Sequence, residues 1–114
     1  MVLQKGEKVF IITRRLFQQD LRRHFAGEVI ECDGSTARVS GYAFVYDDAT
    51  NDFIRREEIR TRIFSLVDGG LIINLISADA NLEDVRYTTN EKHQRILTDG
   101  KTFQMNISEF SARM

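Results

Sequence analysis

Three Asp-Gly pairs divide the chain, and each lies between segments in which apolar and polar residues alternate. They are Asp33-Gly34, Asp68-Gly69 and Asp99-Gly100. An Asp-Gly pair suits a tight turn between antiparallel strands, because glycine adopts positive φ angles at no steric cost. Alternation with a period of two residues is typical of a strand with one buried face. The turns therefore predict three β-hairpins and a mostly β fold.

The first of these hairpins is the clearest, with arms at Val29–Cys32 and Thr36–Tyr46. Its second arm carries small residues on one face and the aromatic residues Tyr42, Phe44 and Tyr46 on the other. Small residues cannot fill a core alone, so we expect the aromatic face to belong to the core. The alternative is an exposed platform on which nucleic-acid bases stack.

Other short segments extend the β pattern along the chain. Seven or eight strands so short and so close together usually form a barrel or a sandwich. We therefore predict a small β-barrel of the SH3-like or Sm-like kind, with an added hairpin at the C-terminus. Beyond the first hairpin, the expected strands are Lys8–Thr13, 59–67, Leu71–Ile76, Arg86–Thr89, Gln94–Thr98 and Thr102–Ile107.

One segment near the start departs from the period of two. Phe17, Leu21 and Phe25 recur at a spacing of four residues, as on one face of an α-helix. Thr13 is a suitable residue to cap the start of such a helix, and Gly27 to end it. The pattern predicts one short amphipathic N-terminal helix, with a bent strand as the alternative.

The composition indicates one domain and the cytoplasm. The 114 residues fit a single domain spanning 1–114, with 16 Lys and Arg residues against 17 Asp and Glu residues. Cys32 is the sole cysteine and cannot form an internal disulfide, which is typical of a reducing compartment. No apolar run is long enough to span a bilayer, and the first residues do not resemble a signal peptide. We expect a cytoplasmic protein with no membrane association.

The residues suited to chemistry are scattered. His24, Cys32 and His93 show none of the spacings of a metal site. Cys32 lies between Glu31 and Asp33, whose negative charges disfavour a reactive thiolate. We predict no metal, no cofactor and no catalytic residue. A small enzyme that uses loop carboxylates is the least favoured reading; its candidates are Asp47, Asp48, Asp52, Glu83 and Asp84.

Two groups of arginines are the candidate binding residues. Guanidinium groups form bidentate contacts with phosphates and carboxylates, so clustered arginines indicate an anion-binding surface. The alternative is a solvated surface with local ion pairs, since Glu57 and Glu58 lie inside the second group. The first group, on the predicted helix, is Arg14, Arg15, Arg22 and Arg23, and the second is Arg55, Arg56, Arg60 and Arg62.

Two functional hypotheses follow. The first is a non-enzymatic binding module that contacts nucleic acid or an acidic protein surface through the arginine-rich helix face. The second is a structural or regulatory homo-oligomer without a small-molecule ligand. It is favoured because open sheet edges need cover, and the chain has no proline to block them.

Overall fold

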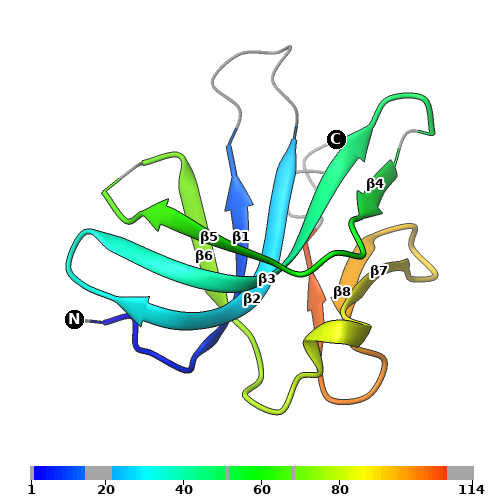
Figure 1. Cartoon of the computed structure of the whole chain (residues 1–114). Coiled ribbons are helices and arrows are strands. Elements are labelled where there is room, and N and C mark those ends of the chain that lie inside the picture. Colours follow the sequence, from blue (N-terminus) through cyan, green and yellow to red (C-terminus); the bar gives the residue numbers. More distant parts are fainter. Residues whose placement is uncertain (1, 15–21, 51, 68, 108–114) are drawn as a thin grey trace. The chain divides into compact units, whose positions relative to one another are not determined.

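The computed structural model describes residues 2–14, 22–50, 52–67 and 69–107. These residues form a mostly β fold that divides into two compact units, Met1–Ala78 and Asp79–Met114 (Figure 1). The single domain expected from the sequence stays a prediction. The first unit contains β1 (Lys8–Thr13), β2 (Arg23–Cys32), β3 (Thr36–Asp47), β4 (Asp52–Arg55), β5 (Arg60–Ser65) and β6 (Leu71–Leu75). The second contains the 3₁₀ turn η1 (Leu82–Asp84), β7 (Arg86–Thr89), β8 (Arg95–Thr98) and β9 (Gln104–Asn106).

The first unit is one antiparallel sheet in the order β4-β3-β2-β1-β6, with β5 also paired to β3. The long strand β3 serves two neighbours on the same side. Its first half pairs with β5, its second half pairs with β4, and Figure 1 shows the long sweep of its ribbon between them. Among the described residues no pairing joins β5 to β6. The sheet is therefore not closed into a barrel, and the SH3-like or Sm-like architecture stays a prediction.

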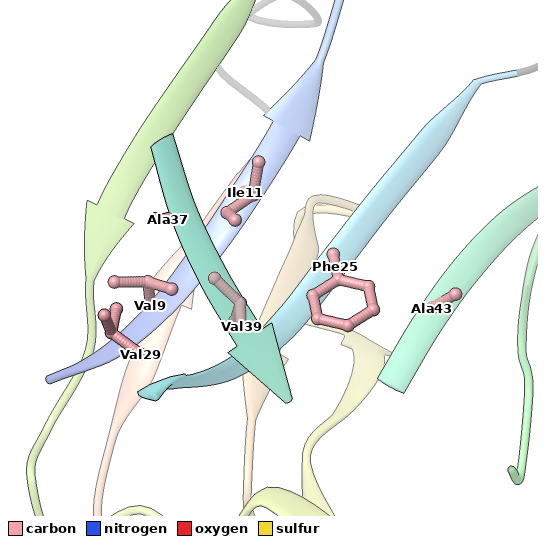
Figure 2. Close-up of a cluster of buried hydrophobic side chains, with 7 residues drawn as sticks. All are labelled: Val9, Ile11, Phe25, Val29, Ala37, Val39 and Ala43. Carbon is pink, nitrogen blue, oxygen red and sulfur yellow. The ribbon is translucent and has the colours of Figure 1, made fainter. Parts of the chain in front are cut away.

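A central cluster of buried side chains lies on one face of this sheet, called the concave face below. Phe10, Tyr42 and Phe44 on the opposite face are buried as well. Residues of the outer strands β5 and β6, including Phe64 and Ile73, pack against the same central cluster. The sheet must therefore curl around that cluster. Figure 2 shows the seven buried side chains, which come from β1, β2 and β3: Val9, Ile11, Phe25, Val29, Ala37, Val39 and Ala43.

The curl depends on a close approach of β2 and β3 at Gly27 and Gly41, which pair directly. A Cβ atom at Gly41 would lie 2.5 Å from the Cα atom of Gly27 and under 3.0 Å from the carbonyl oxygen of Ala26. A Cβ atom at Gly27 would lie 2.5 Å from the carbonyl oxygen of Ser40. Side chains do not fit at these distances, so both positions require glycine for space.

The predicted first hairpin is confirmed, but for a different physical reason. β2 and β3 pair through a turn at Asp33 and Gly34, and Gly34 does not adopt a positive φ angle. The Asp33 carboxylate instead accepts hydrogen bonds from the amides of Ser35 and Thr36, at 2.8 and 2.7 Å. These two bonds lower the pKa of Asp33. The aspartate side chain, rather than the glycine backbone, shapes this turn.

The predicted second hairpin is wrong in its pairing. β5 pairs with β3, and β6 pairs with β1, so strands that follow each other in the chain are not partners. Packing explains the difference. In these positions Phe64 of β5 and Ile73 of β6 both reach the central cluster.

The predicted N-terminal helix is not seen in the described residues. Its last part, Arg23 to Gly27, belongs to β2 and pairs with both β1 and β3. Phe25, Gly27 and Val29 alternate with polar or small residues, and this period of two continues into the hairpin. Strand pairing on both sides outweighs the weaker helical pattern. Residues 15–21 of the predicted helix lie outside the described residues.

The second unit is an antiparallel sheet in the order β7-β8-β9. The predicted hairpin at Asp99-Gly100 is confirmed, and Gly100 has a φ angle of +85°. The carboxylate of Asp99 accepts hydrogen bonds from the amides of Asn81, Lys101 and Thr102 at 2.7 to 3.1 Å, and from the Thr102 hydroxyl at 2.5 Å. These bonds, that of the Thr102 hydroxyl above all, hold the pKa of Asp99 far below its ordinary value of 3.8.

Asp99→Asn is expected to destabilise the second unit. It should also make the stability of that unit depend less on pH in the acidic range. The pKa of Asp99 is lower in the folded than in the unfolded state. Its stabilising contribution is therefore present above the unfolded pKa and is lost as the pH falls below it. Thermal unfolding followed by circular dichroism between about pH 7 and about pH 3 measures this. The control is Glu91→Gln, an exposed side chain of the same unit. Parallel pH profiles for the native protein and Asp99→Asn would contradict the assignment.

Candidate functional site

The strongest candidate site is a group of arginines on the concave face, at Arg23, Arg60 and Arg62. The Arg62 guanidinium carbon lies 5.7 Å from the centroid of the Phe25 ring. Phe25 is only 2% exposed, and its ring centroid lies 5.4 Å from that of Phe64. An arginine over an aromatic face is held by attraction between its charge and the ring quadrupole. Phe25 thus positions the charge at the border of the core.

The strand register explains why these side chains meet. Arg60, Arg62 and Phe64 alternate along β5 and share the concave face, because side chains two residues apart point the same way. Arg62 pairs with Val39 of β3, whereas Phe25 pairs with Ala43 four residues further along β3. The position between them on that face is Gly41, which has no side chain. The glycine that permits the curl therefore also leaves room for Arg62 to extend toward Phe25.

The electrostatics of the group favour an anion. Burial, together with the nearby positive charges of Arg60 and Arg23, lowers the pKa of Arg62 from its ordinary value. An arginine still keeps its charge at neutral pH. Arg60 lies 3.6 Å from the carboxylate of Glu58, and both side chains are well exposed. In the part of the chain that the structure describes, neither Arg23 nor Arg62 lies within ion-pair distance of a carboxylate.

The structure brings together only three of the eight arginines singled out from the sequence. Arg55 lies on the opposite, convex face, 4.2 Å from the Tyr42 ring centroid, and donates to both carboxylate oxygens of Glu57 at 3.0 Å. Arg22 is exposed and lies 5.0 Å from the ring centroid of Tyr46. Arg14 and Arg56 are exposed at strand ends, and Arg15 lies outside the described residues.

The aromatic face of β3 is mainly core, as expected. Tyr42 is 8% and Phe44 1% exposed, which leaves no room for a base to stack on them. Tyr46 is half-buried and meets Phe53 edge to face, with ring centroids 5.3 Å apart. His24 stacks on the ring of Phe53, with ring centroids 4.3 Å apart. The small-residue face also contributes to the core, so β3 is buried on both sides along its middle.

Sequence reasoning missed the supporting residues of the arginine group. The spacing predicts a helix that includes Phe25, and no pattern in the sequence indicates the steric role of Gly27 and Gly41. The signal was present in the alternation of Phe25, Gly27 and Val29, which continues directly into the first hairpin. Read as one long strand, this run places Phe25 on the same face as Val29.

The arginine group is suited to binding an anion. Three guanidinium groups offer planar pairs of donors that match the oxygens of a phosphate or a carboxylate. Among the described residues, no three His, Cys, Asp or Glu side chains are grouped so that they could hold a metal ion. The thiol of Cys32 is half-buried and donates to the carbonyl oxygen of Leu3 at 3.3 Å.

Comparisons with known proteins gave no match to the chain among protein-family models, curated proteins or solved structures. Within the described ranges, no helix has the length and apolar character needed to cross a membrane.

Proposed function

We propose that this chain is a non-enzymatic cytoplasmic binding module, and that Arg23, Arg60 and Arg62 contact the phosphates of a nucleic acid. The main support is that Arg23 and Arg62 have no carboxylate partner among the described residues. Arg62 is also partly buried beside two other positive charges. Gathering like charges is unfavourable by itself. A bound polyanion would remove that cost.

The small size of the site favours a single strand. Contact with three arginines matches a few consecutive phosphates, and the net charge of −1 provides no long-range attraction for a duplex. An acidic protein surface is the other anionic partner that would fit, and binding of an acidic peptide without binding of nucleic acid would identify it.

Fluorescence anisotropy of labelled single-stranded RNA and duplex DNA tests this proposal. We expect binding of the single strand at about 50 mM salt that weakens strongly at about 200 mM. The variant with Arg23, Arg60 and Arg62 changed to alanine should lose it. A variant with Arg38, Arg86 and Lys92 changed to alanine removes the same charge elsewhere and should retain most of it. Equal loss in both variants, or no binding by the native protein at low salt, would overturn the proposal.

As a second candidate we propose a structural or regulatory homo-oligomer. The supporting observation is the exposure of large apolar residues in and beside β5. Ile59 and Ile63 are each 64% exposed, and Val67 is 77% exposed. Exposed apolar residues on neighbouring positions are typical of surfaces that meet another protein.

A further inference from the structure

Strand β5 has one edge without a partner strand in the described part of the chain. It pairs with β3 alone, and the amide of Leu66, just beyond it, donates to the carbonyl oxygen of Ser35 at 2.7 Å. Hydrogen-bonded residues alternate along an antiparallel pair. The even-numbered residues of β5 therefore direct their backbone groups to β3. The odd-numbered residues, Thr61, Ile63 and Ser65, direct theirs to the open edge.

This edge has only part of the usual protection against pairing. Natural edge strands are blocked by proline, by charged side chains, lysine above all, or by a covering element. β5 contains neither proline nor lysine. Its side chains on the convex face, Thr61, Ile63 and Ser65, are uncharged and exposed. The two charges of the strand, Arg60 and Arg62, lie on the concave face instead. An extended uncharged strand can therefore pair with the open edge of β5 without meeting a charged β5 side chain on the convex face.

We infer that two copies of this chain pair edge to edge through β5, antiparallel, with Ile63 opposite Ile63 of the second copy. A twofold axis at this residue places Thr61 opposite the second copy's Ser65. Every open backbone group of one strand then faces an open group of the other. The two Ile63 side chains, each 64% exposed in one copy, cover each other.

The charges on the concave face select this register. With Ile63 at the axis, Arg62 lies opposite the second copy's Phe64, and Arg60 lies opposite its Leu66. With Thr61 at the axis, Arg60 would lie directly opposite the second copy's Arg62, which is unfavourable. With Ser65 at the axis, the pairing would extend into the turn that follows β5. Among the twofold registers, the one centred on Ile63 therefore pairs the most residues of β5 without opposing like charges.

The paired strands would unite two arginine groups into one site. The two Arg62 side chains lie diagonally across the strand pair on the same face, at a spacing of roughly 7 to 8 Å between Cα atoms. A polyanion that crosses the strand pair and contacts both guanidinium groups would offset their repulsion. This step rests on the proposed function. Because linkage is reciprocal, an anion that binds both copies favours the dimer, and the dimer favours the anion.

Sedimentation velocity over a range of protein concentrations, without nucleic acid, tests the pairing. We expect a monomer–dimer equilibrium that Ile63→Lys weakens at least about tenfold. The matched control is Ile72→Lys on β6, where the native side chain is 45% exposed, and it should leave the equilibrium unchanged. A monomer at every concentration, or a dimer equally strong in Ile63→Lys, would overturn the inference.

A disulfide trap tests the register and does not depend on the lysine variant folding well. Cys32 and Ile63 line the same shallow depression, so the test uses a background in which Cys32 is replaced by serine. Cys32→Ser with Ile63→Cys should form a covalent dimer under mild oxidation. Cys32→Ser with Ile72→Cys should remain monomeric after the same oxidation, on a gel run without reducing agent. Equal cross-linking of both would contradict the register.

A third measurement separates this inference from the proposed function. Single-stranded RNA should shift the native protein to dimers at lower protein concentration, and it should not shift Arg62→Ala. If RNA leaves the monomer–dimer equilibrium unchanged, β5 would remain the interface, but anion binding across the two copies would be contradicted. A monomer that binds RNA would overturn the β5 interface and leave the proposed function standing.

Discussion

Gly41→Ala is expected to lower the free energy of unfolding of the six-stranded unit by about 3 kcal/mol or more. The new methyl group would meet backbone atoms of Ala26 and Gly27 rather than the end of a flexible side chain. Backbone atoms in the middle of a paired strand cannot move without breaking ladder hydrogen bonds. Relief would require β2 and β3 to separate where the sheet curls. Urea denaturation followed by circular dichroism measures the loss.

Gly34→Ala is the matched control for this change. Gly34 lies in the turn between the same two strands, and a Cβ atom there would meet nothing within 4 Å. Its φ angle is not in the left-handed region. Alanine at this position is expected to change the stability by less than about 1 kcal/mol. Equal midpoints for the two variants would show that the close approach at Gly41 does not determine the curl.

Phe25→Ala is expected to cost about 3 to 5 kcal/mol of stability, as for other buried phenylalanines. Phe25 is 2% exposed and belongs to the central cluster of Figure 2. Its ring centroid also lies 5.4 Å from that of Phe64 and 5.7 Å from the guanidinium carbon of Arg62. The truncation would therefore leave a cavity in the core and remove the surface on which Arg62 lies. Chemical denaturation measures the first effect.

Phe25→Leu separates the two roles of this side chain. It keeps most of the apolar volume, so the loss in the free energy of unfolding should stay below about 1.5 kcal/mol. It removes the aromatic face under Arg62, so the affinity for single-stranded RNA should fall about two- to fivefold. Phe64→Leu is the control, since no arginine lies over that ring in the contacts described above. An affinity unchanged in Phe25→Leu would show that the ring does not position Arg62.

Sequence alone could predict the β class and the two hairpins formed by local turns. Asp33 and Asp99 each follow one strand and precede the next, and their carboxylates accept amide hydrogen bonds within three residues. Such contacts are local, so the sequence pattern reveals them. The pairing of β6 with β1 is not local. It depends on Ile73 reaching the cluster around Val9 and Ile11, which no spacing in the sequence indicates.

The error over the first helix has a similar cause. Phe17, Leu21 and Phe25 match a helical spacing, but Phe25 also begins a longer alternating run. β1 and β3 supply partners on both sides of β2, and those hydrogen bonds decide the conformation of Arg23 to Gly27. A short periodic pattern could not reveal the presence of two partner strands.

The arginine site was predictable only in its residue type. Sequence proximity grouped Arg22 with Arg23 and Arg55 with Arg56. Strand alternation separates such neighbours, because adjacent side chains point to opposite faces. The structure instead groups Arg23 of β2 with Arg60 and Arg62 of β5, and these two strands are far apart in the chain.

The central claim is that these three arginines contact phosphates, and the salt dependence of binding tests it most directly. The slope of log affinity against log salt for single-stranded RNA should be about −2 for three contacts, at about −0.7 for each phosphate neutralised. Arg62→Ala should reduce that slope by about 0.7, whereas Arg38→Ala should leave it unchanged. Identical slopes for the native protein and Arg62→Ala would contradict the claim.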